Sequence, residues 1–180
     1  MKGASMPELH APPDLSLLSD ADAVKEVYAW SGLALYYAQV LEHALVNLIL
    51  VATGDAGDIS GELEDWDHFF EKYFRKMLSK LIKVARERAD IDDSLGDDLE
   101  TARIQRNYLA HEFFRTHAAD FLHAEGKQRM VRELHGMISQ FQLSTERLDE
   151  LTFEVGAAHG ITESLVHELF AEMLNEDSAS

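Results

Sequence analysis

Residues 19–54, SDADAVKEVYAWSGLALYYAQVLEHALVNLILVATG, decide the fold. Apolar side chains recur in this stretch every three or four residues, which is the spacing of one face of an α-helix. Ser19 and Asp20 are residue types that favour a helix N-cap, and Gly54 favours a helix end. The stretch therefore predicts one long helix whose buried stripe is Val27, Trp30, Leu33, Ala34, Tyr37, Leu41, Leu45, Leu48 and Val51.

The same helical spacing continues through the rest of the chain. It predicts helices over 63–88, 94–118 and 125–155, with a short last helix that begins at Thr162. All three prolines fall within the first 13 residues, and no β-type alternation occurs. We therefore predict an all-α, antiparallel bundle of four to five helices in one domain, residues 19–175. A flexible polar leader, 1–18, would precede it and a frayed tail, 176–180, would follow it.

Composition and charge narrow the classes of function. The 180 residues carry a net charge of −17, which repels nucleic acid at long range. Residues 72–132 hold 13 basic and 10 acidic side chains, a net of +3, whereas the remainder of the chain has a net of −20. The absence of cysteine excludes disulfides, thiolate metal sites and cysteine nucleophiles. No export signal or clean membrane span is visible, so we expect a cytoplasmic protein without a membrane partner.

The third predicted helix carries the residues best suited to chemistry. Its apolar stripe contains Leu95, Leu99, Ala102, Leu109 and Phe113. Arg106 lies in the middle of that stripe, where a charged side chain needs a partner because its burial is costly. His111 lies about 140° around the helix from Arg106, and Asn107, one turn earlier, is placed to hold the imidazole ring. A histidine can move protons to and from ribose and phosphate oxygens, and an arginine can stabilise a phosphorane, so the pair suits RNA cleavage.

The run Arg106-Asn107-Tyr108-Leu109-Ala110-His111 resembles the Arg-(polar)-x-x-x-His motif of the HEPN superfamily, small all-α domains that include toxin and phage-defence ribonucleases. Residues 32–42 and 77–82 are similar to the first two helices of that family, and the resemblance covers about residues 22–155. Unlike members that are modified by a nucleotidyltransferase antitoxin at a tyrosine two places after the histidine, this chain has Phe113 there.

The resemblance implies a homodimer with both motifs in a shared cleft and a metal-independent endoribonuclease that needs no cofactor. Arg106, His111 and Asn107 would be the catalytic residues, and an antitoxin or other regulatory protein would be a partner. Supporting residues would be Glu100, Arg103 and Tyr108, and RNA-contacting residues would be Lys76, Lys80 and Lys83.

Two other interpretations stay open. In the first, the chain is a non-catalytic helical dimer, an adaptor, regulator or inhibitor of a basic partner, and Arg106 pairs with an acid such as Glu42 or Glu100. In the second, Arg106 and His111 have only a structural role. The remaining histidines are weaker candidates: His117 and His123 do not share a helix face with His111, Asp65 and His68 form only one possible ligand pair, and His43, His135, His159 and His167 are expected at the surface or its boundary.

Overall fold

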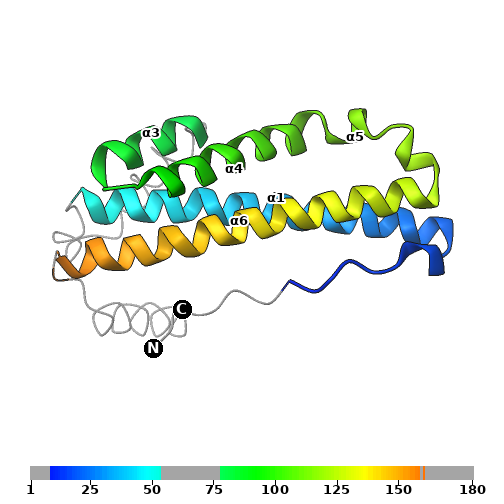
Figure 1. Ribbon diagram of the computed structural model, residues 1–180, viewed down its shortest axis with the longest axis horizontal. Helices are drawn as coiled ribbons and strands as arrows, with labels where there is room; N and C mark the ends of the chain where they lie inside the picture. The colour runs from blue at the N-terminus through cyan, green and yellow to red at the C-terminus, as the bar shows by residue number, and fades with distance from the viewer. Residues whose placement is uncertain (1–8, 54–77, 159, 161–180) are drawn as a thin grey trace, which may run out of the picture. The chain divides into compact units, whose positions relative to one another are not determined.

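The computed structural model describes residues 9–53, 78–158 and 160 (Figure 1). Its elements are η1 (Leu15–Leu17), α1 (Asp20–Ala52), α3 (Leu78–Arg88), α4 (Asp93–His111), α5 (Phe113–Thr116), η3 (Asp120–Leu122) and α6 (Ala124–Ala158). The described part of the chain contains helices and no strand, so the prediction of an all-α bundle is confirmed. The predicted helical segment 63–77 and the helix after Thr162 lie outside the described residues.

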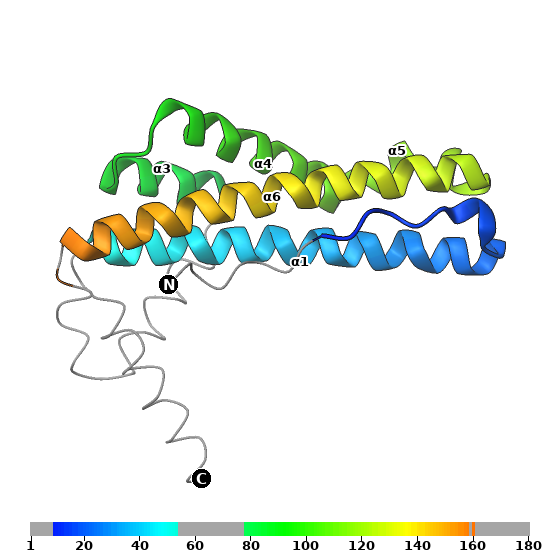
Figure 2. The same ribbon diagram turned by 60° about the horizontal axis from the view of Figure 1, so that its bottom comes forward.

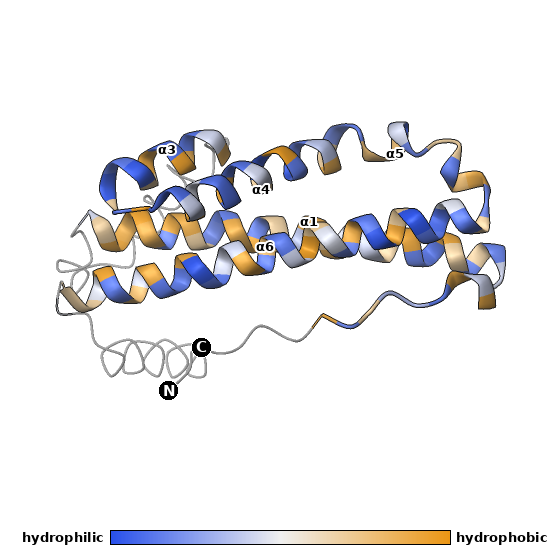
Figure 3. Cartoon of the chain, viewed as in Figure 1, coloured by the Kyte–Doolittle hydropathy of each residue, from blue (hydrophilic) through white to orange (hydrophobic). Residues whose placement is uncertain are grey.

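Helix α1 begins where the sequence predicts. The Ser19 hydroxyl accepts a hydrogen bond from the backbone N–H of Asp22 at 3.2 Å, which is the N-cap interaction. The expected stripe is buried except for Leu33 and Val51, which are half-buried. By length and composition alone α1 could cross a membrane, although 56% of its most apolar window is buried inside the structure, as in the core helix of a globular protein. Figure 3 shows this apolar character along α1.

The chain divides into two compact units, residues 1–43 with 91–147 and residues 44–90 with 148–180. In the first unit α4 runs antiparallel to α1, because Glu42 meets Arg106 while Tyr28 meets Phe114. Helices α1 and α6 run in the same direction, because Asp20 pairs with Lys127 and Trp30 contacts His135 (Figures 1 and 2). The apolar side chains that these helices bury against one another include Val27, Ala34, Tyr37, Leu41, Leu95, Leu99, Leu109, Phe113, Met130, Leu134 and Phe141.

The described part of the second unit contains α3 and the C-terminal ends of α1 and α6. Its buried side chains include Leu45, Leu48, Ile49, Leu78, Leu81, Ile82, Ala85 and Leu148. The basic side chains of α3, among them Lys80 and Lys83, are exposed. Apolar residues on one face and basic residues on the other make α3 amphipathic, as its sequence predicts.

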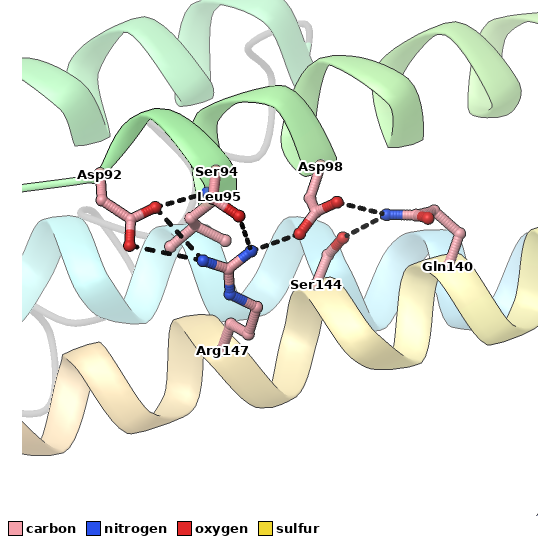
Figure 4. Close-up of polar contacts among 7 residues, drawn as sticks. All are labelled: Asp92, Ser94, Leu95, Asp98, Gln140, Ser144 and Arg147. Atoms are coloured by element: carbon pink, nitrogen blue, oxygen red, sulfur yellow. Dashed lines mark hydrogen bonds and ion pairs between the residues drawn. The ribbon is translucent and has the colours of Figure 1, made fainter.

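Polar contacts attach the start of α4 to α6 (Figure 4). Asp92 caps α4 by accepting a hydrogen bond from the backbone N–H of Leu95 at 2.6 Å. The guanidinium of Arg147 on α6 donates to Asp92 at 3.2 Å and also binds Ser94 and Asp98. An arginine with its five donors in one plane suits such a cluster of acceptors, so this network fixes α4 along its neighbour.

Two predictions about these segments are wrong. The leader is not free over its described part: Leu15 is buried, and Gln128 of α6 accepts from its N–H at 2.7 Å and donates to the carbonyl of Pro13 at 3.1 Å. The third helix does not continue to residue 118, because it breaks at Glu112, where the backbone leaves the helical region (φ −127°, ψ −26°). The break accompanies complete burial of Phe113, whose ring packs edge-on against Tyr108.

Candidate functional site

Arg106 lies in the apolar stripe of α4 and has the acidic partner that this position requires. Leu95, Leu99, Ala102, Leu109 and Phe113 are all buried, as the helical spacing predicts. The Nε of Arg106 donates to Oε1 of Glu42 on α1 at 3.1 Å, with 34% of the arginine side chain and 19% of the glutamate side chain exposed. Of the two acids suggested by the sequence, Glu42 is therefore the partner. Both Nη groups of Arg106 are without a hydrogen bond among the described residues.

His111 is the last residue of α4 and is exposed. Ile104, seven residues earlier and so on the same side of the helix, is also exposed. Asn107 is half-buried, and within the described chain no hydrogen bond joins it to His111. The expected support of the imidazole by Asn107 is thus not formed in this structure.

The other residues assigned to the site lie elsewhere or outside the described residues. Arg103 donates two hydrogen bonds to the carboxylate of Glu100, from Nε to Oε2 at 2.8 Å and from Nη2 to Oε1 at 2.6 Å. Glu100 therefore pairs with Arg103, and Arg106 pairs with Glu42. Tyr108 turns to His117, as described below. Lys80 and Lys83 belong to the second unit, and Lys76 is outside the described residues. Arg106, paired with Glu42, and the exposed His111 are the two predicted residues on which the candidate site is built.

The sequence reasoning missed a cluster of polar side chains around the buried His117. Nδ1 of His117 lies 2.9 Å from Oδ2 of Asp120 on η3, and Nε2 lies 2.9 Å from Oε2 of Glu133 on α6. The hydroxyl of Tyr108 on α4 is 3.2 Å from the same Nε2, and Arg129 pairs with the other oxygen of Asp120. The two carboxylates thus lie on opposite sides of the ring, each within hydrogen-bonding distance of one ring nitrogen.

This His117 cluster ties the end of α4, the η3 turn and the start of α6 together. Burial raises the pKa of the Tyr108 hydroxyl, and the negative charge of Glu133 raises it further, so Tyr108 stays a neutral hydrogen-bonding group. The pair His117-x-x-Asp120 is the signal that the sequence offered. The described residues contain no group of three His, Asp or Glu side chains arranged to hold a metal ion.

Replacing Asp120 with asparagine should lower the free energy of unfolding at neutral pH and have a smaller effect in acid. Hydrogen bonds from His117 and Arg129 hold the pKa of the Asp120 carboxyl below its ordinary value. A carboxyl with a depressed folded-state pKa adds stability above its unfolded pKa of about 3.9, and this stability is lost as the pH falls through the lower folded value. Urea unfolding of wild type and Asp120→Asn at neutral pH and at about pH 3 measures the difference. A difference that is the same at both pH values would contradict the assignment.

A pocket of about 230 Å³ lies elsewhere in the first unit. It is lined by Pro12, Pro13, Asp14, Gln128 and Arg132 and contains none of the candidate catalytic residues. Searches against protein-family models, curated proteins and solved structures found no match to this chain.

Proposed function

We propose that this protein is a metal-independent endoribonuclease of the HEPN type that acts as a homodimer. One observation supports this most: Glu42 holds Arg106 through Nε alone, so both Nη groups stay available for a phosphate. His111, five residues further along the same helix, is exposed at its end. A positioned guanidinium and an accessible imidazole are the two groups that RNA cleavage by a 2′-hydroxyl needs.

The chemistry assigns one role to each residue. The imidazole of His111 takes the proton from the ribose 2′-hydroxyl, which attacks the adjacent phosphorus and displaces the 5′-oxygen. His111 of the second copy donates a proton to that leaving oxygen. Arg106 donates hydrogen bonds to the equatorial oxygens of the phosphorane, where negative charge develops, and its planar fork of donors matches phosphate geometry.

The charge distribution limits how such an enzyme meets RNA. The net charge of −17 opposes association with RNA, whereas the local net charge of +3 over residues 72–132 favours it weakly. RNA binding should therefore be weak and sensitive to salt. A basic partner that covers acidic surface would relieve the repulsion or control the activity, which suits a component of a toxin–antitoxin or phage-defence system in the cytoplasm.

The ion pair between Glu42 and Arg106 also fits a second, non-catalytic function. If Glu42 only neutralises Arg106, then the chain is a non-catalytic helical dimer whose acidic surface binds a basic protein. The net of −20 outside residues 72–132 supports this alternative. Co-purification of a basic partner, together with intact RNA after incubation with the dimer, would favour it over the enzyme.

Glutamine at position 42 tests the proposed enzyme against a matched control. Glu42→Gln removes the charge that orients Arg106 and should lower the cleavage rate about tenfold, a loss of about 1.4 kcal/mol of transition-state stabilisation. Glu100→Gln removes an acid of the same type that pairs with Arg103 instead and should cleave like the wild type. Glu42→Asp should recover part of the activity. The readout is single-turnover cleavage of labelled RNA, with the folded fraction of each variant measured by circular dichroism. Equal rates for the Glu42 and Glu100 variants would overturn the proposed role of Arg106.

A further inference from the structure

The exposed side of α1 in the first unit is uncharged over most of its length. We call it the outer face of α1, and it consists of Ala21, Lys25, Tyr28, Gly32, Leu35, Tyr36, Gln39 and His43, all exposed. Three of its members are large and partly apolar: Tyr28 is 56% exposed, Leu35 41% and Tyr36 58%. Single apolar residues at a surface need no explanation, but several on one helical stripe mark an interaction surface.

Gly32 stands at the centre of the outer face. Glycine in an exposed helix interior is unfavourable relative to alanine, because it carries more conformational entropy in the unfolded chain. A Cβ at Gly32 would meet no described atom within 4 Å, so the packing of the described chain does not require a glycine there. The absence of a side chain at this position would, however, let a second helix approach closely.

The residues on either side of Gly32 form a self-complementary pattern. In two antiparallel copies of α1 that cross at Gly32, position 32 − n of one lies opposite 32 + n of the other. Tyr28 then faces Tyr36, and Leu35 faces Ala29, an exposed residue beside the outer face. Each tyrosine thus meets a tyrosine, and the large aliphatic side chain meets a small one. These offsets of three and four residues are those that share a helix face. A surface that is complementary to itself is what a two-fold interface requires.

The charges of the outer face fit a second copy of this acidic chain. Lys25 is its only Asp, Glu, Lys or Arg residue, and it lies opposite Gln39 in the same arrangement. The acids of α1 lie off this face: Asp22 pairs with Lys25 at 2.8 Å, and Glu42 pairs with Arg106. The outer face itself therefore brings no carboxylate to the interface. Asp22 and Glu42, which flank it, fall opposite each other in this arrangement, and each is already paired with a cation, Lys25 and Arg106.

We propose that the outer face of α1 binds a second copy of this chain, antiparallel and across a two-fold axis at Gly32. Tyr28 extends the interface, because its ring already contacts Phe114 and Phe121, each at 5.6 Å between centroids. Helix axes pack about 8–10 Å apart, and Cα atoms lie about 2.3 Å from the axis, so the two Cα atoms of residue 32 would be roughly 3.5–5.5 Å apart. That range overlaps the roughly 4.4–6.8 Å that a disulfide spans.

A single introduced cysteine tests this arrangement, because the natural chain contains none. Gly32→Cys should form a covalent dimer under mild oxidation about 100-fold faster than Gly136→Cys, because thiols within a dimer see each other at millimolar effective concentration. Gly136 is the matched control: it is an exposed helical glycine with equally open space, but its helical neighbours are the polar residues Arg132 and Gln140. A mixture of Tyr28→Cys and Tyr36→Cys should cross-link faster than either variant alone, which tests the register.

Equal rates for the two glycine variants would overturn the proposed interface, as would a wild-type chain that sediments as a monomer at the concentrations used for cross-linking. The inference does not depend on RNA cleavage. His111→Ala introduced into Gly32→Cys should leave the cross-linking rate unchanged, so loss of cleavage and loss of this interface are separate results. The inference shares only the homodimer with the proposed function, and a monomeric wild-type chain would overturn both.

Discussion

Replacing His111 with alanine should reduce RNA cleavage about 10²- to 10⁴-fold, the usual contribution of a general acid–base group. His111 is exposed at the end of α4, so the fold should keep its stability to within about 0.5 kcal/mol. The large effect on cleavage and the small effect on folding together distinguish a catalytic residue from a structural one. Single-turnover cleavage of labelled RNA and urea unfolding measure the two quantities.

His123→Ala is the matched control for this experiment. His123 is also an exposed histidine of the first unit, beside the η3 turn, and no role in cleavage is assigned to it. It should cleave RNA like the wild type. If His111→Ala retained the wild-type rate, the enzyme proposal would be abandoned in favour of the non-catalytic dimer.

Replacing Gly126 with alanine should destabilise the protein by about 3 kcal/mol or more, at the upper end of the range for an overpacked core. Gly126 is buried in the first turn of α6, and a Cβ there would overlap the backbone carbonyl and Cα of Asp120. Backbone atoms cannot rotate away as a flexible side chain can. Asp120 is also held by His117 and Arg129, so relief of the overlap would disrupt the His117 cluster.

Gly136→Ala, on the same helix, should instead raise the free energy of unfolding. A Cβ at Gly136 meets nothing within 4 Å, and alanine is favoured over glycine in a helix by about 1 kcal/mol. Urea unfolding of both variants measures the contrast between them. A Gly126→Ala protein as stable as the wild type would mean that η3 does not pack on α6 as described.

Helical spacing predicted that Arg106 needs an acidic partner, but it did not identify that partner. The projection of the predicted helix 94–118 placed Arg106 in its apolar stripe, and the cost of burying the charge suggested an acid such as Glu42 or Glu100 as its partner. The choice between them depends on neighbours in space. Glu100 is one turn before Arg103 and binds it locally, while the antiparallel course of α1 and α4 brings Glu42 opposite Arg106.

The His117 cluster was missed for a reason that is also physical. Projection on one continuous helix separates His111 from His117, and no local signal predicted the break at Glu112. Burial of Phe113 stabilises that break, and burial depends on the neighbouring helices. The third side chain of the cluster that contacts His117, Glu133, lies 16 residues away on α6, a separation that periodicity does not address.

The sequence by itself determined that the chain is helical, which face of each described helix is buried and that Arg106 needs an acid, because these properties follow from the 3.6-residue period and the cost of burying charge. The tertiary structure alone decided that Glu42 is this acid, that the segment around Leu15 is attached to α6 and that His117 joins three elements. Each of these depends on which helices are neighbours and in which direction they run. That choice is made by packing between distant segments, and no local pattern in the sequence encodes it.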